Sequence, residues 1–149
     1  MKTYIGTKII QAEPAFRIDG EIYPESGPVP RSMNREEGYR VHYPDGYESW
    51  SPLEAFQEAY RPTEHMNFGL AIEAARKGKR IARKGWNGKG QYVELASAIS
   101  YTSPGGETVN ANHEAIGNHA FAFVGTSGVQ MGWLASQADM LADDWTIVE

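Results

Sequence analysis

The residues best suited to chemistry in this chain lie between Met66 and Gln91, where one tryptophan stands among glycines and basic residues. Gly85 and Gly88 flank Trp86, and the small neighbours leave room beside the indole for a flat partner. Stacking of a base on an aromatic side chain contributes about 1–3 kcal/mol. A tryptophan in such a turn can equally fold back and close the core of its own module. The sequence leaves both interpretations open.

Positive charge is concentrated in the same stretch. Seven of the fourteen Lys and Arg residues fall inside it and none follows it: Arg76, Lys77, Lys79, Arg80, Arg83, Lys84 and Lys89. Arginine forms two-pronged hydrogen bonds with phosphate oxygens. Arg80, Arg83 and Lys84 could therefore contact a phosphate, or they could form the solvated basic edge of a sheet, which protects sheets against mispairing.

A second polar segment joins an expected strand end to an expected helix. It runs from Trp133 to Met140 and contains Ser136, Gln137 and Asp139. Backbone N–H groups at a helix N-terminus can hold an anion or a sugar hydroxyl. Gln137 and Asp139 add groups suited to a base edge or a sugar diol. Capping of the helix by Ser136 and Asp139 explains the same residues without a ligand.

Signals for catalysis are poor. Asp143 and Asp144 are adjacent, and adjacent carboxylates rarely converge as acid and base. His113 and His119 are six residues apart, which is not a standard zinc spacing, so we expect neither a metal nor a cofactor. Nucleophile-elbow, Walker and dinucleotide-binding motifs are absent from the sequence.

The overall composition is that of a globular protein. The 149 residues are 41% hydrophobic and 22% charged, with a net charge of −5 and no cysteine. The acidic balance argues against a general nucleic-acid binder, because phosphate backbones require a basic surface. The lack of cysteine fits a cytoplasmic protein. No apolar run approaches the roughly 20 residues that cross a bilayer, and the start lacks a signal-peptide core. We therefore expect a soluble intracellular protein.

The first half of the chain predicts a strand, a loop, a hairpin and a helix. Lys2 to Ala12 alternates loosely, and the proline-rich segment from Pro14 to Arg35 predicts a long irregular loop. Alternation predicts strands at 38–43 and 47–50 around a Pro-Asp-Gly turn. Ser51-Pro52-Leu53-Glu54 resembles a capping box that opens a helix to about residue 60. Aromatic residues of the hairpin could form a ligand surface or, more simply, the packed face of a small sheet: Tyr39, Tyr43, Tyr47 and Trp50.

The second half predicts a helix followed by short strands. Asn67 is suited to cap a helix over 68–77 that buries Phe68, Ala71, Ile72 and Ala75, with Gly78 following it. Strands are expected at 79–83, 91–96, 120–125, 129–133 and 145–148, with a short helix after Ser136 ending near residue 142. The polar segment 97–119 predicts a long loop with a functional or mobile role.

These elements do not alternate as βαβ units. We therefore predict an α+β fold of small antiparallel sheets with short helices, arranged in two modules. Residues 1–65 hold seven basic and eleven acidic residues, whereas residues 66–149 hold seven and eight. This asymmetry, together with Pro62 and the internal Met66, predicts an N-terminal module over 1–65 and a second domain over 66–149.

Two stretches together resemble a phage and prophage family, the second family of Thoeris anti-defence proteins. They are MNFGLAIEAARKGKRIARKGWNGKG and GWLASQADMLADDWTIV, and the resemblance covers residues 66–149. The N-terminal segments MKTYIGTKIIQAEP and GYRVHYPDGYESWSP resemble another small phage-encoded accessory module of unknown role.

The resemblance implies a molecular sponge. Family members are described as homotetramers that hold glyco-cyclic ADP-ribose, and in some relatives cyclic dinucleotides, at subunit interfaces without cleaving them. This implies a non-catalytic protein acting in the cytoplasm of the infected bacterial host, with no nucleic-acid polymer or membrane as partner. It implies that Trp86 and Trp133 stack on the base and that Trp145 belongs to the core. The other implied contacts are Phe68, Arg83, Asn87, Gln137 and Asp139.

Two other functions stay open. A phosphodiesterase-like enzyme could degrade the same signals, with Asp139, Asp143, Asp144 or the loop histidines as acid and base. A phage structural accessory could use the N-terminal module to recruit a partner. Intact ligand after incubation and denaturation would favour the sponge, and incorporation into purified particles would favour the accessory.

Overall fold

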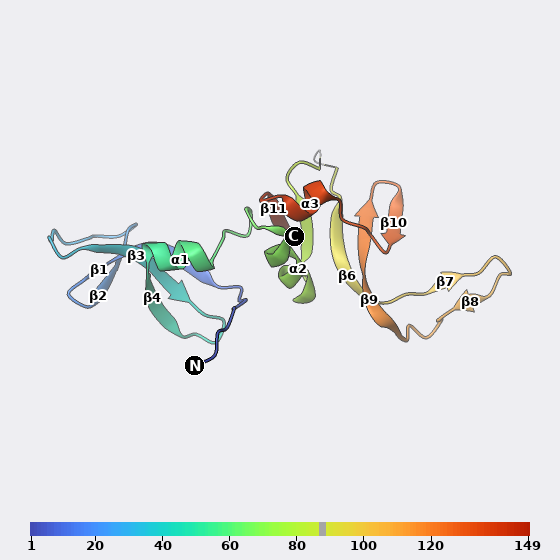
Figure 1. Cartoon of the computed structure of the whole chain (residues 1–149), viewed down its shortest axis with the longest axis horizontal. Coiled ribbons are helices and arrows are strands. Elements are labelled where there is room, and N and C mark those ends of the chain that lie inside the picture. The colour runs from blue at the N-terminus through green and yellow to red at the C-terminus, as the bar shows by residue number, and fades with distance from the viewer. Residues whose placement is uncertain (87–88) are drawn as a thin grey trace. The chain divides into compact units, whose positions relative to one another are not determined.

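The chain divides into two compact units. The computed structural model describes residues 1–86 and 89–149, with residues 115–118 described by their backbone alone. Unit 1 comprises Met1–Arg61 and unit 2 comprises Pro62–Glu149 (Figure 1). Both are built from antiparallel strands with short helices, which confirms the predicted α+β class. The assignment of separate roles to two domains stays a prediction.

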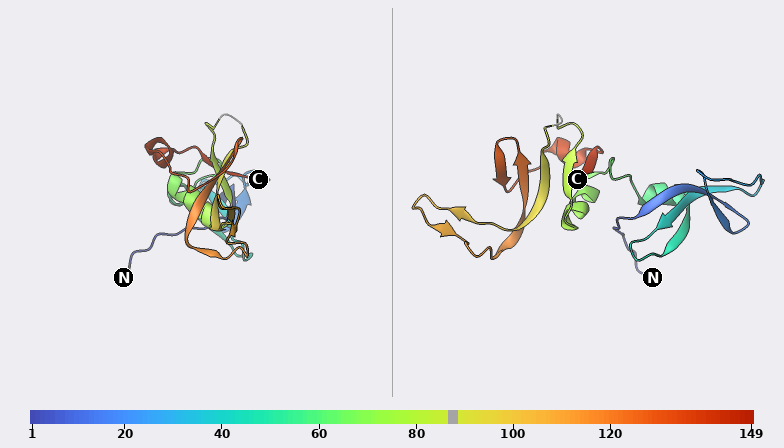
Figure 2. Two further views of the ribbon diagram at one scale, coloured as in Figure 1. Left: turned by 90° about the vertical axis from the view of Figure 1, so that its right-hand side faces the viewer. Right: turned by 180° about the vertical axis from the view of Figure 1, so that it is seen from behind.

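Unit 1 is a four-stranded antiparallel sheet with one helix. Its strands are β1 (Gln11–Ile18), β2 (Glu21–Pro24), β3 (Glu36–His42) and β4 (Glu48–Pro52), in the order β2-β1-β3-β4. Helix α1 (Leu53–Ala59) follows β4 directly and lies across one face of this sheet (Figures 1 and 2). The predicted strands of the 38–50 hairpin are confirmed.

The N-terminal strand prediction is wrong. Residues 1–10 form neither helix nor strand, and β1 begins at Gln11. Gln11 pairs with His42, the last residue of β3, and the chain then turns away through Gly46. A strand over residues 2–10 therefore has no neighbouring strand in its own unit to supply hydrogen-bonding partners.

The prediction of an irregular loop from Pro14 to Arg35 is also wrong, because β1 and β2 form a hairpin inside it. The backbone nitrogen and carbonyl of Pro14 point toward β2, at the position where β2 ends. The carbonyl of Pro14 accepts a hydrogen bond from the N–H of Glu25 at 3.0 Å. The missing N–H of proline thus interrupts no bond between β1 and β3. The turn is Asp19-Gly20, with φ angles of 50° and 85°, and an Asp-Gly pair is a strong hairpin signal that the sequence already contained.

The helix after β4 is confirmed, but its capping box is not. Pro52 is the N-cap of α1, and no side chain caps the helix. Ser51 lies in β4 one residue before the N-cap, where it pairs with Tyr39.

Unit 2 is a five-stranded antiparallel sheet with two helices. Helix α2 (Phe68–Arg76) precedes β5 (Arg80–Arg83) and β6 (Tyr92–Ala98). Strands β9 (Ala115–Gly125) and β10 (Gly128–Met131) form a hairpin, and helix α3 (Gln137–Leu141) precedes β11 (Trp145–Val148). The strand order is β10-β9-β6-β5-β11, and α2 packs against β5, β6 and β11. The five strands predicted for this half are confirmed, with shifted ends.

The core of unit 2 lies between α2 and the sheet. Asn67 caps α2 as predicted, its side chain accepting a bond from the N–H of Leu70 at 2.9 Å, and Gly78 follows the helix with φ 87°. Trp145 is fully buried, which confirms its predicted place in the core. The other buried members of the cluster are Met66, Ala71, Ala74, Ala75, Ile81 and Val93.

The segment 97–119, predicted as a loop, contains a protruding hairpin arm. Its strands are β7 (Tyr101–Thr102) and β8 (Thr108–Val109), and its flanks belong to β6 and β9 (Figure 1). Asn110, with φ 56°, ties the base of the arm, since its side-chain amide donates to the carbonyls of Ile99 and Glu114 at 2.5 and 2.7 Å. The loop was predicted from the polar composition of the segment. The strands of the arm were missed because they pair only with each other and bury little apolar surface.

Candidate functional site

An aromatic cluster on unit 2 brings together residues from distant parts of the chain. The ring of Trp86 lies 5.5 Å from Trp145, 6.0 Å from Trp133 and 5.4 Å from Phe123, measured between centroids. Phe68 at the start of α2 closes the group, 5.3 Å from Trp145 and 6.4 Å from Trp133. Most of these rings meet edge to face, the arrangement that aromatic pairs favour. Three of the predicted site residues, Phe68, Trp86 and Trp133, therefore lie in one cluster.

The members of this cluster differ in burial. Trp145 is completely buried, and its indole N–H donates to the backbone carbonyl of Asp139 at 2.8 Å. Trp86 and Trp133 are only partly buried and pack against the core from outside. Both interpretations of Trp86 are thus compatible with its position, since the residue packs against the core but is only partly buried. The buried Trp145 packs against both Trp86 and Trp133.

The turns that present the two outer indoles are set by backbone hydrogen bonds. The N–H of Trp86 donates to the carbonyl of Arg83 at 3.2 Å, which forms the turn after β5. The N–H groups of Gly132 and Trp133 both donate to the carbonyl of Phe121, at 2.9 and 3.0 Å. Gly132 has φ 82°, a conformation that favours glycine, and this turn directs the chain from β10 toward α3.

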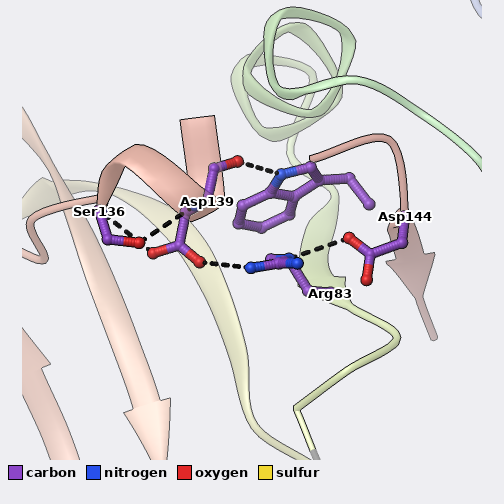
Figure 3. Close-up of polar contacts among 5 residues, drawn as sticks. Arg83, Ser136, Asp139 and Asp144 are labelled. Carbon is purple, nitrogen blue, oxygen red and sulfur yellow. Dashed lines mark hydrogen bonds and ion pairs between the residues drawn. The ribbon is translucent and has the colours of Figure 1, made fainter. Parts of the chain in front are cut away.

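Arg83 lies between two carboxylates beside the cluster (Figure 3). Its Nε donates to Oδ1 of Asp144 at 2.9 Å, and its Nη1 donates to Oδ1 of Asp139 at 3.1 Å. The Arg83 side chain is 23% exposed, and those of Asp139 and Asp144 are 15% and 34% exposed. The guanidinium therefore connects the end of β5 to Asp139 in α3 and to Asp144, the residue that precedes β11.

The same contacts shift the ionisation of all three groups. The hydrogen bond from Arg83 lowers the pKa of Asp144. Burial opposes ionisation of Asp139, but hydrogen bonds from Ser136 and Arg83 outweigh it, so the pKa of Asp139 is also lowered. Hydrogen bonds to Asp144 and then Asp139 raise the pKa of Arg83. All three groups are therefore charged at neutral pH, with one positive charge facing two negative ones.

Asp139 also caps α3. The hydroxyl of Ser136 accepts from the N–H of Asp139 at 3.1 Å, and Oδ2 of Asp139 accepts from the N–H of Ser136 at 3.0 Å. This is the capping box that the sequence predicted. Both carboxylate oxygens of Asp139 thus have protein partners, whereas Gln137 is exposed on the first turn of α3. Ligand contacts by Arg83, Gln137 and Asp139 stay predictions, and Asn87 lies outside the described residues.

Three residues at the site were not among the predicted contacts. Asp144 reaches Arg83 because Arg83 pairs with Trp145 in the register of β5 and β11, and that register is not visible in the sequence. Phe123 packs on Trp86 from β9, and the apolar alternation of its strand was the signal that marks it. Nε2 of His65 lies 3.3 Å from Nζ of Lys84, a contact that no spacing rule predicts.

The other predicted phosphate contacts differ in their surroundings. Lys84 lies at the start of the turn that presents Trp86, and its only described side-chain contact is the one to His65. Arg80 lies on β5 and pairs with Glu94 on β6 at 3.5 Å, while its guanidinium stands 4.6 Å from the ring centroid of Tyr92. Arg80 therefore belongs to the solvated surface of the sheet, whereas Arg83 and Lys84 lie next to the aromatic cluster.

Among residues 1–86 and 89–149, no group of three or more His, Cys, Asp or Glu side chains is placed to hold a metal ion. Asp143, the neighbour of Asp144, is exposed. The described side chains thus bring together an aromatic surface and an ion-paired network, which are suited to binding.

Comparison with known proteins identifies the family. Residues 66–148 match the model of the Thoeris anti-defense 2-like domain, and this match covers more than half of the chain. The chain belongs to the Thoeris anti-defense 2-like family. A relative, Thoeris anti-defense 2 of Bacillus phage SP01, is 35% identical over 85 residues, which are 56% of this chain and 94% of that protein. The resemblance found in the sequence of residues 66–149 is confirmed.

The Thoeris anti-defense 2-like domain coincides with nearly all of unit 2, including the aromatic cluster and the Arg83 network. Unit 1 lies outside the matched residues. In the part of the chain that the structure describes, no helix is both long enough and apolar enough to span a membrane.

Proposed function

We propose that this protein is a phage anti-defence sponge that acts in the infected bacterium. It binds cyclic signalling nucleotides such as glyco-cyclic ADP-ribose, with cyclic dinucleotides as a further class, and holds them without cleavage. The observation that carries the proposal is the cluster of Phe68, Trp86 and Trp133 on a domain of the Thoeris anti-defense 2-like family. By removing the signal from solution, the protein blocks Thoeris-type immunity.

The aromatic cluster supports binding of a base. Trp86 and Trp133 pack against the core and are only partly buried, and we expect the accessible part of each residue to include its indole. The buried Trp145 contacts both rings and limits their movement. A surface that is already ordered loses little conformational entropy when it binds, and a cyclic ligand is itself preorganised.

The charges near the cluster limit how a pyrophosphate is held. Asp144 accepts from Nε of Arg83 and Asp139 accepts from Nη1, so a ligand oxygen would meet Nη2 or the second N–H of Nη1. Lys84, next in the chain and in contact with His65, supplies a second cation on the same turn as Trp86. In this arrangement the ligand phosphate lies between Arg83 and Lys84 while the base contacts Trp86.

Assembly of a homotetramer would place these surfaces at subunit interfaces. Unit 2 exposes large apolar side chains around α3 and β10, with Leu134 90%, Leu141 77% and Val129 66% exposed. Exposed apolar patches are typical of surfaces that bind another protein. Strand β10 is also an edge strand of its sheet. These features favour association of copies through the exposed apolar side chains and the free strand edge of unit 2.

The ion-paired aspartates argue against an enzyme that degrades the same signals. Hydrogen bonds from Ser136 and Arg83 lower the pKa of Asp139 against the effect of burial, and the hydrogen bond from Arg83 lowers the pKa of Asp144, so neither holds a proton at neutral pH with which to act as a general acid. Asp139 is further committed to capping α3. Sequestration needs affinity and not transition-state stabilisation, so catalytic groups are unnecessary.

The proposal is tested by calorimetry followed by mass spectrometry. The full chain is titrated with cyclic ADP-ribose isomers and cyclic dinucleotides, and the complex is then denatured. We expect saturable binding and recovery of intact ligand. A ligand of altered mass would instead establish the enzyme, and an absence of binding with incorporation into phage particles would establish the structural accessory.

A pair of variants tests the indole itself. Trp86→Ala should abolish ligand retention while size-exclusion chromatography still shows a folded oligomer. Trp86→Phe keeps an aromatic ring against Phe123 and should retain part of the affinity. Undiminished binding by Trp86→Ala would remove this residue from the site.

A further inference from the structure

The first residues of unit 2 add a short extra edge to its sheet. The N–H of Ile147 in β11 donates to the carbonyl of Thr63 at 3.0 Å. Met66 and Trp145 exchange two backbone hydrogen bonds, at 2.8 and 3.1 Å, and the side chain of Met66 is buried in the core. Residues 63–66 are therefore fixed along the side of β11 that faces away from β5.

This edge places His65 beside Lys84. The N–H of His65 donates to the carbonyl of Pro62 at 2.9 Å, so a turn holds its backbone directly before the bridge to β11. The N–H of Lys84 donates to the carbonyl of Asp144 at 3.1 Å, which fixes the backbone of Lys84 at the end of β5. Nε2 of His65 then lies 3.3 Å from Nζ of Lys84. Backbone hydrogen bonds therefore set the positions from which these two exposed side chains meet.

The chemistry of this contact leaves the charge of Lys84 available. An ammonium group only donates hydrogen bonds, so Nε2 of His65 is the acceptor and the proton of the neutral imidazole lies on Nδ1. An imidazole orients the ammonium without cancelling its charge, unlike the two carboxylates that pair with Arg83. In the part of the chain that the structure describes, no carboxylate lies within ion-pair distance of Lys84. Its remaining N–H groups can therefore meet an anion.

The position of Lys84 links this contact to the aromatic cluster. The N–H of Trp86 donates to the carbonyl of Arg83 at 3.2 Å, so Lys84 lies inside the turn that presents the Trp86 indole. A lysine side chain carries much rotamer freedom, and fixing its direction before binding lowers the entropy that an anionic ligand must remove. A partner for Lys84 on unit 2 therefore affects how tightly phosphate is held next to Trp86.

We propose that His65 is a positioning residue for the anionic part of the ligand. It holds the ammonium of Lys84 toward the phosphate groups of a nucleotide whose base contacts Trp86. This inference rests on the proposed function and adds a residue to it. His65 precedes residues 66–148, which match the family model, so this contribution comes from a segment outside the matched domain.

The test is calorimetric titration of the full chain with glyco-cyclic ADP-ribose. His65→Ala removes the acceptor and should weaken binding about threefold to tenfold, because Lys84 must then be ordered by the ligand alone. His65→Gln supplies an amide oxygen as acceptor and should restore most of the affinity. Thr63→Ala is the matched control on the same edge: its backbone carbonyl still accepts from Ile147, and affinity should be unchanged.

A double-mutant cycle separates positioning from a general effect on the fold. Lys84→Met removes the charge and keeps a long side chain, so His65→Ala should cause no further loss in the Lys84→Met background. Additive losses, equal binding by wild type and His65→Ala, or no rescue by His65→Gln would overturn the assignment and leave the proposed function intact. Absence of binding by the wild-type chain would overturn both.

Discussion

Replacement of Arg83 by glutamine should destabilise unit 2 by about 2–3 kcal/mol. Arg83 makes two charge-assisted hydrogen bonds, at 2.9 and 3.1 Å, and its removal leaves Asp139 and Asp144 facing each other without a cation. Breaking a fully buried ion pair costs about 3–5 kcal/mol, whereas an exposed pair contributes about 0–1 kcal/mol. Asp144 is 34% exposed and screened by solvent, so the expected cost lies between these ranges.

The measurement is urea unfolding followed by tryptophan fluorescence, since three of the four tryptophans belong to unit 2. Arg80→Gln is the matched control on the same strand. Arg80 pairs with Glu94 at 3.5 Å, and these side chains are 50% and 40% exposed, so its loss should cost less than about 1 kcal/mol. We expect a lower urea midpoint for Arg83→Gln with an unchanged slope.

A double-mutant cycle separates the ion pair from other effects of the substitution. Asp144→Asn should cost stability in the wild-type background and little in the Arg83→Gln background, with a coupling energy of about 1 kcal/mol or more. The reasoning is refuted if Arg83→Gln is no more destabilising than Arg80→Gln, or if the coupling energy is zero.

Further outcomes follow from other contacts. Because Asp139 and Asp144 have lowered pKa values, the stability they contribute is present above pH ~4 and lost as the pH falls through their folded pKa values; acid titration by circular dichroism should show this loss, reduced in Asp144→Asn. Gly38→Ala should destabilise unit 1 by about 1–3 kcal/mol in thermal unfolding, since its Cβ would clash with the backbone carbonyl oxygen of Ser51 and would lie 2.7 Å from the Trp50 ring. Asn67→Ala should cost about 1 kcal/mol in urea unfolding by removing the cap of α2; no loss would mean that the cap is dispensable.

The local elements of unit 2 could be read from the sequence because neighbouring residues determine them. The side chain of Asn67 reaches the N–H of Leu70, three residues away, and Ser136 caps α3 through Asp139 in the same way. These interactions are completed within one helical turn. The apolar Ile81 is buried in β5 and the charged Arg80 beside it is exposed, as their side-chain types predict.

Prolines and polar residues predicted the positions of strands and loops less well. Pro14 lies within β1, and it is tolerated because its missing N–H falls where β2 ends. The effect of a proline on a strand thus depends on which neighbouring strand it faces, and that is a property of the assembled sheet. The arm of β7 and β8 was missed because its strands contact only each other, so no hydrophobic periodicity marks them.

The sequence by itself determined the α+β class and the family, and it singled out three aromatic residues that the structure places in one cluster, since these depend on residue types and short spacings. Only the tertiary structure decided how charge is distributed at the site. Arg83 and Asp144 are 61 residues apart, and the register of β5 with β11 brings them together. The register of β5 with β11 depends on tertiary packing, because Trp145 and residues of α2 belong to one hydrophobic core that joins distant segments of the chain. It is this packing that converts Arg83 from a free cation into the centre of an ion-paired network.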